Sequence, residues 1–437
     1  MKVFFYSLGC KVNQYDSEAM GEMFIKEGCS VTENPEEADI IIVNSCSVTA
    51  VADQKSRQTA RRFKRDYPDA VTVLTGCMPQ AYPEQAETVT EVDVITGNKE
   101  RKMIPELVRQ ARERKNGEKH EPVIYLPHHE QKDVFEETSI ENFEGRTRAF
   151  IKVQDGCNRY CSYCIIPTSR GFSRSRSLES IDRELGAIRD AGFKEVVLVG
   201  INFCCYGLDN GSDFTEPIRL ACEHGFERVR IGSLEFDNIT PEAIDKLAGL
   251  GNFCPQFHMS LQSGSDNVLK SMRRHYTTEE FKETCNLLRK AFKDTSITTD
   301  IMVGFPGETD EDHKASMEFA KEIGFEKIHV FPYSSRPGTL AAKMDNQIPG
   351  KIKTERAREM RIAASGIRKA YLKKLIGETV NVLCETFDGE KVFGYTENYT
   401  PVYADSKKTL HNEIVKVRIE SCDDENCYGI IEETAGN

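Results

Sequence analysis

The sequence predicts an α/β protein in three successive parts: an N-terminal domain with an open α/β sheet, a central partial (β/α)6 barrel, and a small C-terminal β-barrel. Short apolar runs alternate with helical patterns up to about residue 114, a second such series begins near residue 146, and helical periodicity is lost after about residue 377. Strand–helix alternation is typical of parallel sheets with right-handed crossovers. Short strands separated by turns are typical of a small barrel.

The chain is long enough for several domains. Its 437 residues suffice for two or three, each with its own apolar core. We expect residues 1–114 to form the N-terminal domain, 115–142 a linker, 143–375 the central barrel with a basic helix at its end, and 376–437 the C-terminal barrel. In the linker the periodic pattern gives way to glycine, proline, acidic residues and the pair His128-His129, which we interpret as exposed rather than metal-binding.

Composition narrows the possible functions. Fifteen cysteines without an export signal indicate reduced thiols and metal ligation rather than disulfides, and a cytoplasmic protein. Residues Met1 to Leu8 are interpreted as a buried strand instead of a signal peptide, and we expect no membrane association because no run of about eighteen apolar residues is present. The formal net charge of −12 excludes bulk attraction of nucleic acid to the whole surface. An RNA partner therefore needs a local basic face.

Three cysteines of the N-terminal domain occupy equivalent positions. Each follows a predicted strand within three residues: Cys10 after Val3–Leu8, Cys46 after Ile40–Val43, and Cys77 after Val71–Leu74. In an open parallel sheet these strand ends lie along one edge, where ligands bind. The three thiols are therefore expected to be neighbours that share a metal or cluster site, although buried structural cysteines give the same spacing. Cys29 lies in a turn at the opposite edge and is interpreted as structural.

Six strands are predicted in the central part, with helical patterns between most of them. The strands are Ala149–Val153, Val196–Val199, Arg228–Ile231, Phe257–Leu261, Thr298–Val303 and Ile328–Tyr333, and the helices include Leu178–Ala191, Pro241–Leu250, Thr278–Phe292 and Glu311–Ile323. Six βα repeats predict a partial barrel with its chemistry at the C-terminal ends of the strands.

Polar residues and glycines follow several of these strands. They are Gly200 and Asn202, Ser233, Gln262 and Gly304. Glycine lets the backbone approach a ligand closely, and the polar side chains can bind a ribose, a carboxylate or an ammonium group. Each of these residues also fits an ordinary turn or helix cap, so they are candidates for cofactor binding as a set.

The loop after the first barrel strand holds three cysteines. Cys157, Cys161 and Cys164 are spaced C-x3-C-x2-C, and neither a histidine nor a fourth cysteine is close in sequence. A structural zinc site is closed by four protein ligands. A [4Fe–4S] cluster on three thiolates instead leaves one iron open, and thiolates suit iron–sulfur clusters. We favour the cluster, and a zinc knuckle with a distant fourth ligand is the alternative.

The last part of the chain is the expected RNA face. The segment from Lys351 to Lys374 has a helical pattern rich in basic residues, which include Arg358 and Arg361. Short strands follow at Val380–Glu385, Lys391–Tyr395, Val402–Ala404, Glu413–Ile419 and Tyr428–Ile431. Small β-barrels often bind RNA, and Tyr395, Tyr399 and Tyr403 could stack on bases or belong to the core. For the helix, a solvated surface is the alternative.

Together these motifs resemble the radical S-adenosylmethionine (SAM) methylthiotransferase family. The resemblance rests on Gly9-Cys10-Lys11-Val12-Asn13, Asn44-Ser45-Cys46 and Thr75-Gly76-Cys77, on Gly156-Cys157-Asn158-Arg159-Tyr160-Cys161-Ser162-Tyr163-Cys164 with Arg170-Gly171 behind it, and on a C-terminal barrel like the RNA-binding TRAM domain. Gly9 to Ser17 and Gly394 to Tyr399 are most similar to the branch that acts on N6-threonylcarbamoyladenosine in tRNA. The sister branches act on isopentenyl-adenosine in tRNA or on an aspartate of a small-subunit ribosomal protein, and both are alternatives.

The resemblance implies two [4Fe–4S] clusters and SAM. The SAM-binding cluster would lie on Cys157, Cys161 and Cys164, an auxiliary cluster on Cys10, Cys46 and Cys77, and SAM itself against Gly200, Asn202, Ser233, Gln262 and Gly304. One SAM would methylate a sulfur of the auxiliary cluster. A second would give a 5′-deoxyadenosyl radical that takes hydrogen from C2 of adenosine 37. Cys204 and Cys205 are predicted to be dispensable, because neighbours in an extended segment point to opposite faces.

The resemblance also implies partners. These are a tRNA anticodon stem-loop and an electron donor such as flavodoxin or ferredoxin, and we expect a monomer. A threonylcarbamoyl group adds a carboxylate, which a guanidinium can bind with two hydrogen bonds. The candidates for this contact and for RNA binding are Arg170, Arg174 and Arg176, with Arg358 and Arg361 on the basic helix. A non-catalytic RNA-binding zinc protein is the alternative, and it predicts a colourless protein.

Overall fold

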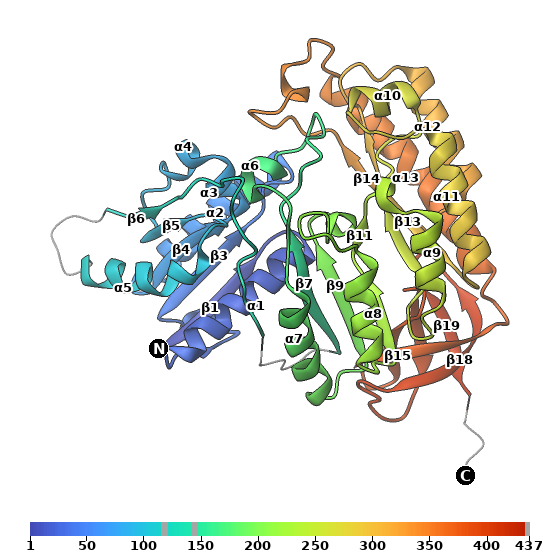
Figure 1. Cartoon of the computed structure of the whole chain (residues 1–437), viewed down its shortest axis with the longest axis horizontal. Coiled ribbons are helices and arrows are strands. Elements are labelled where there is room, and N and C mark those ends of the chain that lie inside the picture. Colours follow the sequence, from blue (N-terminus) through green and yellow to red (C-terminus); the bar gives the residue numbers. More distant parts are fainter. Residues whose placement is uncertain (115–120, 141–146, 433–437) are drawn as a thin grey trace.

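The computed structural model describes residues 1–114, 121–140 and 147–432 and confirms the predicted fold class. An N-terminal sheet with its helices lies beside a central partial barrel, and a small closed β-barrel lies below the central strands in Figure 1. The boundaries expected near 114 and 142 border or fall in segments outside the described residues. Within the described ranges, no helix has both the length and the apolar character needed to cross a bilayer.

Six parallel strands form the N-terminal sheet in the order β2-β1-β3-β4-β5-β6. The strands are β1 Lys2–Ser7, β2 Ser30–Val31, β3 Ile40–Ser45, β4 Val71–Gly76, β5 Val94–Thr96 and β6 Val123–Tyr125, and the helices are α1 Lys11–Lys26, α2 Ala50–Asp66, α3 Cys77–Ala81, α4 Pro83–Ala86 and α5 Ile104–Arg114. Every residue of β3 and β4 is buried. Strands covered on both faces have near-continuous apolar sequences, which is why these two are evident in the sequence.

Part of the segment 115–142, predicted as a linker, belongs to this sheet. Strand β6 pairs in parallel with β5, and Phe135 and Ile140 are buried further along. The interpretation of His128-His129 as exposed is wrong for His129, whose side chain is largely buried with its Nδ1 atom 3.3 Å from Asp133 Oδ2. A short apolar run between two prolines thus extends the sheet by one edge strand.

The central part consists of two four-stranded sheets, ordered β10-β9-β7-β8 and β11-β12-β13-β14, with a parallel bridge from Val229 to Phe253 between them. The strands are β7 Arg148–Asp155, β8 Arg174–Ser175, β9 Glu195–Gly200, β10 Arg228–Ile231, β11 Ser233–Leu234, β12 Gln256–Met259, β13 Ser296–Val303 and β14 Lys327–Pro332. All six predicted strands are present. The additional β8 and β11 have two residues each, and β8 is antiparallel to β7.

Helices cover the outside of the central strands (Figure 1). They are α7 Leu178–Asp190, α8 Thr215–Glu223, α9 Pro241–Ala248, α11 Thr278–Ala291 and α12 Asp310–Ile323. Helix α6 Ile166–Arg170 instead packs against α3 of the N-terminal domain, and α10 Asp266–Ser271 lies above the strands in Figure 1. Helices α11 and α12 begin with capping boxes, formed by Thr277 with Glu280 and by Thr309 with Asp312. These pairs satisfy N–H groups that have no partner inside the helix, so both helices begin close to the positions that the sequence predicts.

The C-terminal part begins with the long basic helix α13, Gly350–Lys373, and continues into the small barrel. Its strands are β15 Thr379–Phe387, β16 Lys391–Thr396, β17 Pro401–Asp405, β18 Ile414–Cys422 and β19 Cys427–Ile431. They close in the order β15-β16-β17-β19-β18 around an apolar core that includes Leu372 of α13. Closure leaves no free sheet edge.

Buried arginines attach this small barrel to the central one. Arg230 donates to Glu397 O at 2.8 Å, and its Nε atom lies 3.0 Å from Glu195 Oε1. Arg228 donates to Tyr395 O at 2.9 Å. Arg228, Arg230 and Glu195 are each at most 1% exposed, so their charges depend on one another and on the backbone of the small barrel.

Two of the three tyrosines considered for base stacking lie in this contact. The rings of Tyr395 and Tyr399 stack at 4.5 Å, with the guanidinium of Arg148 5.0 Å or less from both ring centres. Arg230 lies 4.8 Å from the Tyr399 ring centre. Cations over aromatic rings are stabilising, so these two tyrosines contribute to domain attachment.

Replacing Arg230 with methionine is expected to destabilise the protein by about 3 kcal/mol. This is the lower end of the cost of breaking a buried ion pair, because Arg228 remains 3.7 Å from the Glu195 carboxylate. Urea unfolding followed by circular dichroism measures the change. Arg219→Met is the control: its ion pair with Glu223 is half-exposed and should contribute about 1 kcal/mol or less. Equal shifts for both variants would contradict a structural role for Arg230.

Candidate active site

The loop after β7 presents Cys157, Cys161 and Cys164 at the mouth of the central barrel, each partly exposed. Gly156 has a φ of +74°, and a Cβ atom there would lie 1.9 Å from Phe172 O, so the turn into the loop requires glycine. The backbone then fixes the loop: Cys157 N donates to Gly171 O and Cys164 N donates to Cys161 O, both at 3.0 Å.

An N–H group approaches each of these sulfurs. Asn202 Nδ2 lies 3.5 Å from Cys157 Sγ, Arg274 Nη1 lies 3.4 Å from Cys161 Sγ, and Ile166 N lies 3.5 Å from Cys164 Sγ. Burial raises the pKa of Cys157 and Cys164, and a coordinating metal deprotonates such thiols. Three sulfurs with N–H donors around them fit a [4Fe–4S] cluster, which is tuned by hydrogen bonds to its sulfurs.

The structure brings Cys10, Cys46 and Cys77 together at one edge of the N-terminal sheet. Cys10 caps α1, Cys46 follows β3, and Cys77 begins α3 directly after β4. The pKa of Cys46 is raised to about 12, mainly by burial and secondly by the nearby Cys77 thiol. Gly9 has a φ of +99°, and a Cβ atom there would lie 2.8 Å from Cys46 Sγ. The chain is therefore tightly packed around the sulfur of Cys46.

The donor sets at both sites consist of sulfur alone, and thiolates suit iron–sulfur clusters. In a [4Fe–4S] cluster each cysteine binds a different iron. Each trio thus offers one sulfur to each of three irons.

Asn98 contacts the N-terminal trio and was not predicted from the sequence. Its Nδ2 atom lies 3.2 Å from Cys77 Sγ and 3.0 Å from Ser169 O, and its side chain is buried. Asn98 follows β5 just as the cysteines follow β1, β3 and β4, so its position after a strand was an available signal. Asn98 thus connects the edge of the N-terminal sheet that holds Cys10, Cys46 and Cys77 with α6, the helix that follows the loop of Cys157, Cys161 and Cys164.

Arg170 lies between the two thiol sites. It is 1% exposed, its Nη1 atom lies 3.0 Å from Asp155 Oδ1, and its Nη2 atom lies 2.9 Å from Asp16 Oδ2. It also donates to Asn13 Oδ1. Its charge counteracts the effect of burial, which raises the pKa of Cys10. Arg170 thus connects helix α1, which begins beside Cys10, to the end of β7 that leads into the cluster loop.

The two carboxylates of this network are ionised. Burial alone would raise the pKa of Asp16, but Arg101, Lys152 and Arg170 lower it below its ordinary value. In the same way Lys152 and Arg170 outweigh burial at Asp155 and hold its pKa well below the ordinary value. Buried charges are tolerated when they are paired and hydrogen-bonded. The network therefore fixes the N-terminal domain against the mouth of the barrel.

The structure corrects the prediction that Arg170, Arg174 and Arg176 form an RNA-binding group. Arg170 is committed to two aspartates, and Arg176 is 1% exposed and pairs with Glu184. Arg174 is 8% exposed and donates to Arg170 O at 3.0 Å and to Phe172 O at 2.7 Å. The guanidinium groups are already bound within the protein, by neighbouring residues for Arg174 and Arg176 and also by the distant Asp16 for Arg170.

The predicted SAM-binding residues lie at or just beyond neighbouring strand ends of the barrel. Gly200 ends β9, and Ser233 begins the short β11. Gln262 and Gly304 follow β12 and β13 with positive φ angles. Asn202 is buried, and its Oδ1 atom has no hydrogen-bond partner in the described part of the chain. This orphaned acceptor lies beside Cys157 and suits a ligand ammonium group; SAM binding by the five residues stays a prediction.

Comparisons with known proteins concern both thiol sites. Residues 2–97 match the family described as "Uncharacterized protein family UPF0004", and residues 151–320 match the "Radical SAM superfamily". The chain is 37% identical to "Threonylcarbamoyladenosine tRNA methylthiotransferase MtaB" of Bacillus subtilis, over 95% of this chain and 93% of the relative. The chain belongs to the radical SAM methylthiotransferase family. Membership implies SAM and a [4Fe–4S] cluster, and the N-terminal family implies a second cluster.

A second relative agrees with this membership, and a solved structure shares the fold. "tRNA-2-methylthio-N(6)-dimethylallyladenosine synthase" of Alkaliphilus oremlandii is 33% identical, over 95% of this chain and 89% of the relative. The radical S-adenosylmethionine methyltransferase TsrM of Kitasatospora setae matches with a TM-score of 0.58 at 15% identity, over 78% of this chain and 74% of that chain. The latter likeness concerns the fold alone.

The basic helix α13 of this methylthiotransferase has both exposed and buried arginines. Arg358 and Arg361 are exposed, and RNA binding by them stays a prediction. Arg356 is buried beside Glu308 at 2.7 Å, and Arg368 is buried beside Glu326 at 2.7 Å. Some of the basic residues that the sequence pattern assigns to an RNA-binding face therefore attach the helix to the barrel.

Proposed function

We propose that this enzyme methylthiolates C2 of N6-threonylcarbamoyladenosine at position 37 in the anticodon stem-loop of tRNA. The observation that carries the proposal is similarity along the whole chain. The relative named for threonylcarbamoyladenosine is 37% identical, and the relative named for dimethylallyladenosine is 33% identical. Flavodoxin or ferredoxin would be the electron donor, and the enzyme would act as a cytoplasmic monomer.

In this proposal the two thiol trios have different tasks. Cys157, Cys161 and Cys164 hold the SAM-binding [4Fe–4S] cluster, and Cys10, Cys46 and Cys77 hold the auxiliary one. When bound, the clusters supply the electron that cleaves SAM to a 5′-deoxyadenosyl radical and the sulfur that is methylated and transferred, with two SAM molecules used per product. Three protein ligands per cluster leave one iron of each open.

The side chains around these sites position the reactants. Asn202 would accept a hydrogen bond from the SAM ammonium group, while Asn98 orients the thiolate of Cys77. Arg170 and its aspartates keep the two thiol sites at a fixed separation. The target base must leave its stack to reach the barrel mouth, which costs little in a single-stranded loop. Arg358 and Arg361 would contact phosphates, and such binding weakens with salt.

Anaerobic assays with matched anticodon stem-loops test the proposal. Three RNAs of identical sequence carry threonylcarbamoyladenosine, isopentenyl-adenosine or unmodified adenosine at position 37, and mass spectrometry of the digested nucleosides measures the methylthio product. We expect the threonylcarbamoyl form to be converted at least about tenfold faster than the others, because a site that binds a polar group discriminates strongly against analogues without it. Equal conversion of the threonylcarbamoyl and isopentenyl forms, or preference for isopentenyl, would assign the enzyme to the sister branch.

A further inference from the structure

A cavity of about 430 Å³ opens beside the cysteine loop. Ligand sites are commonly clefts of about 300–1,000 Å³ with a few convergent polar groups. Its walls come from the cluster loop, from the short helices η3 Phe203–Cys205 and η4 Phe236–Asn238, and from the segments beside them. The lining residues are Asn158, Arg159, Ser173, Cys205, Leu208, Asp209 and Asn238. The cavity lies at the mouth of the barrel, because Asn158 directly follows Cys157.

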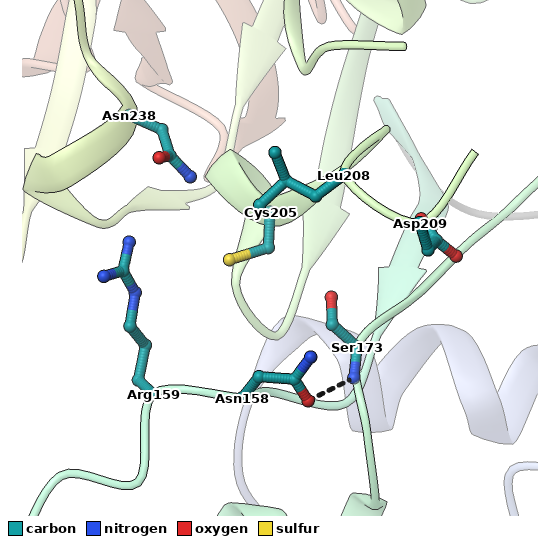
Figure 2. A pocket seen from close by; sticks show the side chains of 7 residues that line it. All are labelled: Asn158, Arg159, Ser173, Cys205, Leu208, Asp209 and Asn238. Atoms are coloured by element: carbon teal, nitrogen blue, oxygen red, sulfur yellow. Dashed lines mark hydrogen bonds between the residues drawn. The ribbon is translucent and has the colours of Figure 1, made fainter. Parts of the chain in front are cut away.

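The side chains around this cavity converge on it. In Figure 2 the guanidinium of Arg159 and the sulfur of Cys205 point into the space between Asn158 and Asn238. Arg159 is a cation in the lining of this cavity, and the buried Cys205 lies in the same lining. A guanidinium can bind a carboxylate with two hydrogen bonds. A carboxylate in the cavity would therefore suit Arg159.

The remaining polar groups are held in place by the protein. Asn158 Oδ1 accepts from Ser173 N at 3.0 Å, and Asn238 Nδ2 donates to Cys204 O at 2.6 Å. Asp209 Oδ2 accepts from Ser175 N at 2.9 Å, and its other oxygen accepts from the Ser175 hydroxyl. The acidic residue of the cavity is thus bound by two donors, and the arginine is its cationic group.

We propose that this cavity binds the threonylcarbamoyl substituent of the substrate, with Arg159 bound to its carboxylate. The inference rests on the proposed function and names the site of its specificity. Asn158 and Asn238 suit the hydroxyl and carbamoyl groups, and Leu208 suits the methyl group. An isopentenyl group cannot form hydrogen bonds with the polar side chains of the cavity. These side chains would lose their bound water without gaining a new partner, which is unfavourable.

Binding at this position also orients the reacting carbon. C6, which bears the substituent through N6, and C2 flank the same ring nitrogen of adenine. A substituent fixed beside Cys157 therefore holds C2 close to the part of the barrel mouth where SAM is proposed to bind. Orientation of this kind raises the rate of a reaction without altering its chemistry.

A cycle of enzyme and substrate variants tests the assignment. Wild type and Arg159→Gln, both reconstituted and matched for iron content, are compared on stem-loops with threonylcarbamoyladenosine or its methyl ester, which lacks the negative charge. Wild type should prefer the acid to the ester by about 10- to 100-fold in kcat/KM, as expected for a hydrogen-bonded charge pair. Arg159→Gln should convert both alike. Equilibrium binding of the same RNAs by fluorescence anisotropy gives a readout independent of turnover.

Two further variants make the test robust to misfolding. Arg159→Lys should restore part of the preference for the acid, because it retains the charge but not the two-pronged geometry. Asn238→Asp should weaken binding of the acid more than of the ester, because it adds a negative charge to the cavity. If wild type prefers the acid and Arg159→Gln keeps that preference in full, the assignment of the cavity is wrong while the proposed function stands. If wild type does not convert the threonylcarbamoyl RNA, the proposed function itself fails.

Discussion

Replacing Cys157, Cys161 and Cys164 together with alanine is expected to remove about half of the iron and all reductive cleavage of SAM. The iron estimate follows from two thiol trios that would each hold a four-iron cluster. Cleavage should be lost because only this trio lies beside the predicted SAM-binding residues, with Asn202 3.5 Å from Cys157 Sγ. Anaerobic purification, iron and sulfide analysis, and chromatography of 5′-deoxyadenosine provide the measurements.

A matched control separates cluster loss from general damage. Cys222 and Cys422 are also partly exposed but belong to α8 and β18, so their replacement with alanine should leave iron and cleavage unchanged. Iron content that stays the same in the Cys157/Cys161/Cys164 variant would contradict a cluster at this loop. Colourless wild-type protein that contains zinc would favour the zinc alternative.

Much of the fold is predictable because buried parallel strands have a distinct sequence. Strands β3 and β9 are apolar over most of their length, and each was predicted close to its observed bounds. The strands β8 and β11 were not, because a two-residue strand has no periodicity and is defined by its partner. Strand β5, Val94–Thr96, is similarly short. Missing it also concealed the significance of Asn98, which follows it.

The site was only partly predictable, for a different physical reason. The spacing of Cys157, Cys161 and Cys164 is local, and Cys10, Cys46 and Cys77 each follow a predicted strand, so both thiol trios could be predicted from the sequence. Arg170 and Arg159 both follow or lie in the cysteine loop, and the sequence does not distinguish them. The structure distinguishes them, because Arg170 is buried and one of the two carboxylates that hold it belongs to Asp16, which is 154 residues away. The approach of Arg274 to Cys161 likewise joins residues 113 positions apart.

Replacing Cys10, Cys46 and Cys77 with alanine is expected to abolish methylthiolation while 5′-deoxyadenosine is still formed. The reason is spatial: these thiols lie at the edge of the N-terminal sheet, whereas the SAM candidates lie at the strand ends of the barrel. Iron should again fall by about half, since one of two clusters is lost. Both products can be measured in one anaerobic reaction. Cys29→Ala is the control, because Cys29 is buried in the apolar core of the same domain.

The two triple variants are most informative when compared. Both should lose about the same share of iron, but only the Cys10/Cys46/Cys77 variant should retain SAM cleavage. This asymmetry is expected if the two sites hold separate clusters with separate tasks. Loss of 5′-deoxyadenosine in a folded Cys10/Cys46/Cys77 variant would contradict that division. Arg170 would then be the first residue to consider, because it contacts Asp16 of α1 and Asp155 at the end of β7 and could transmit the change between the sites.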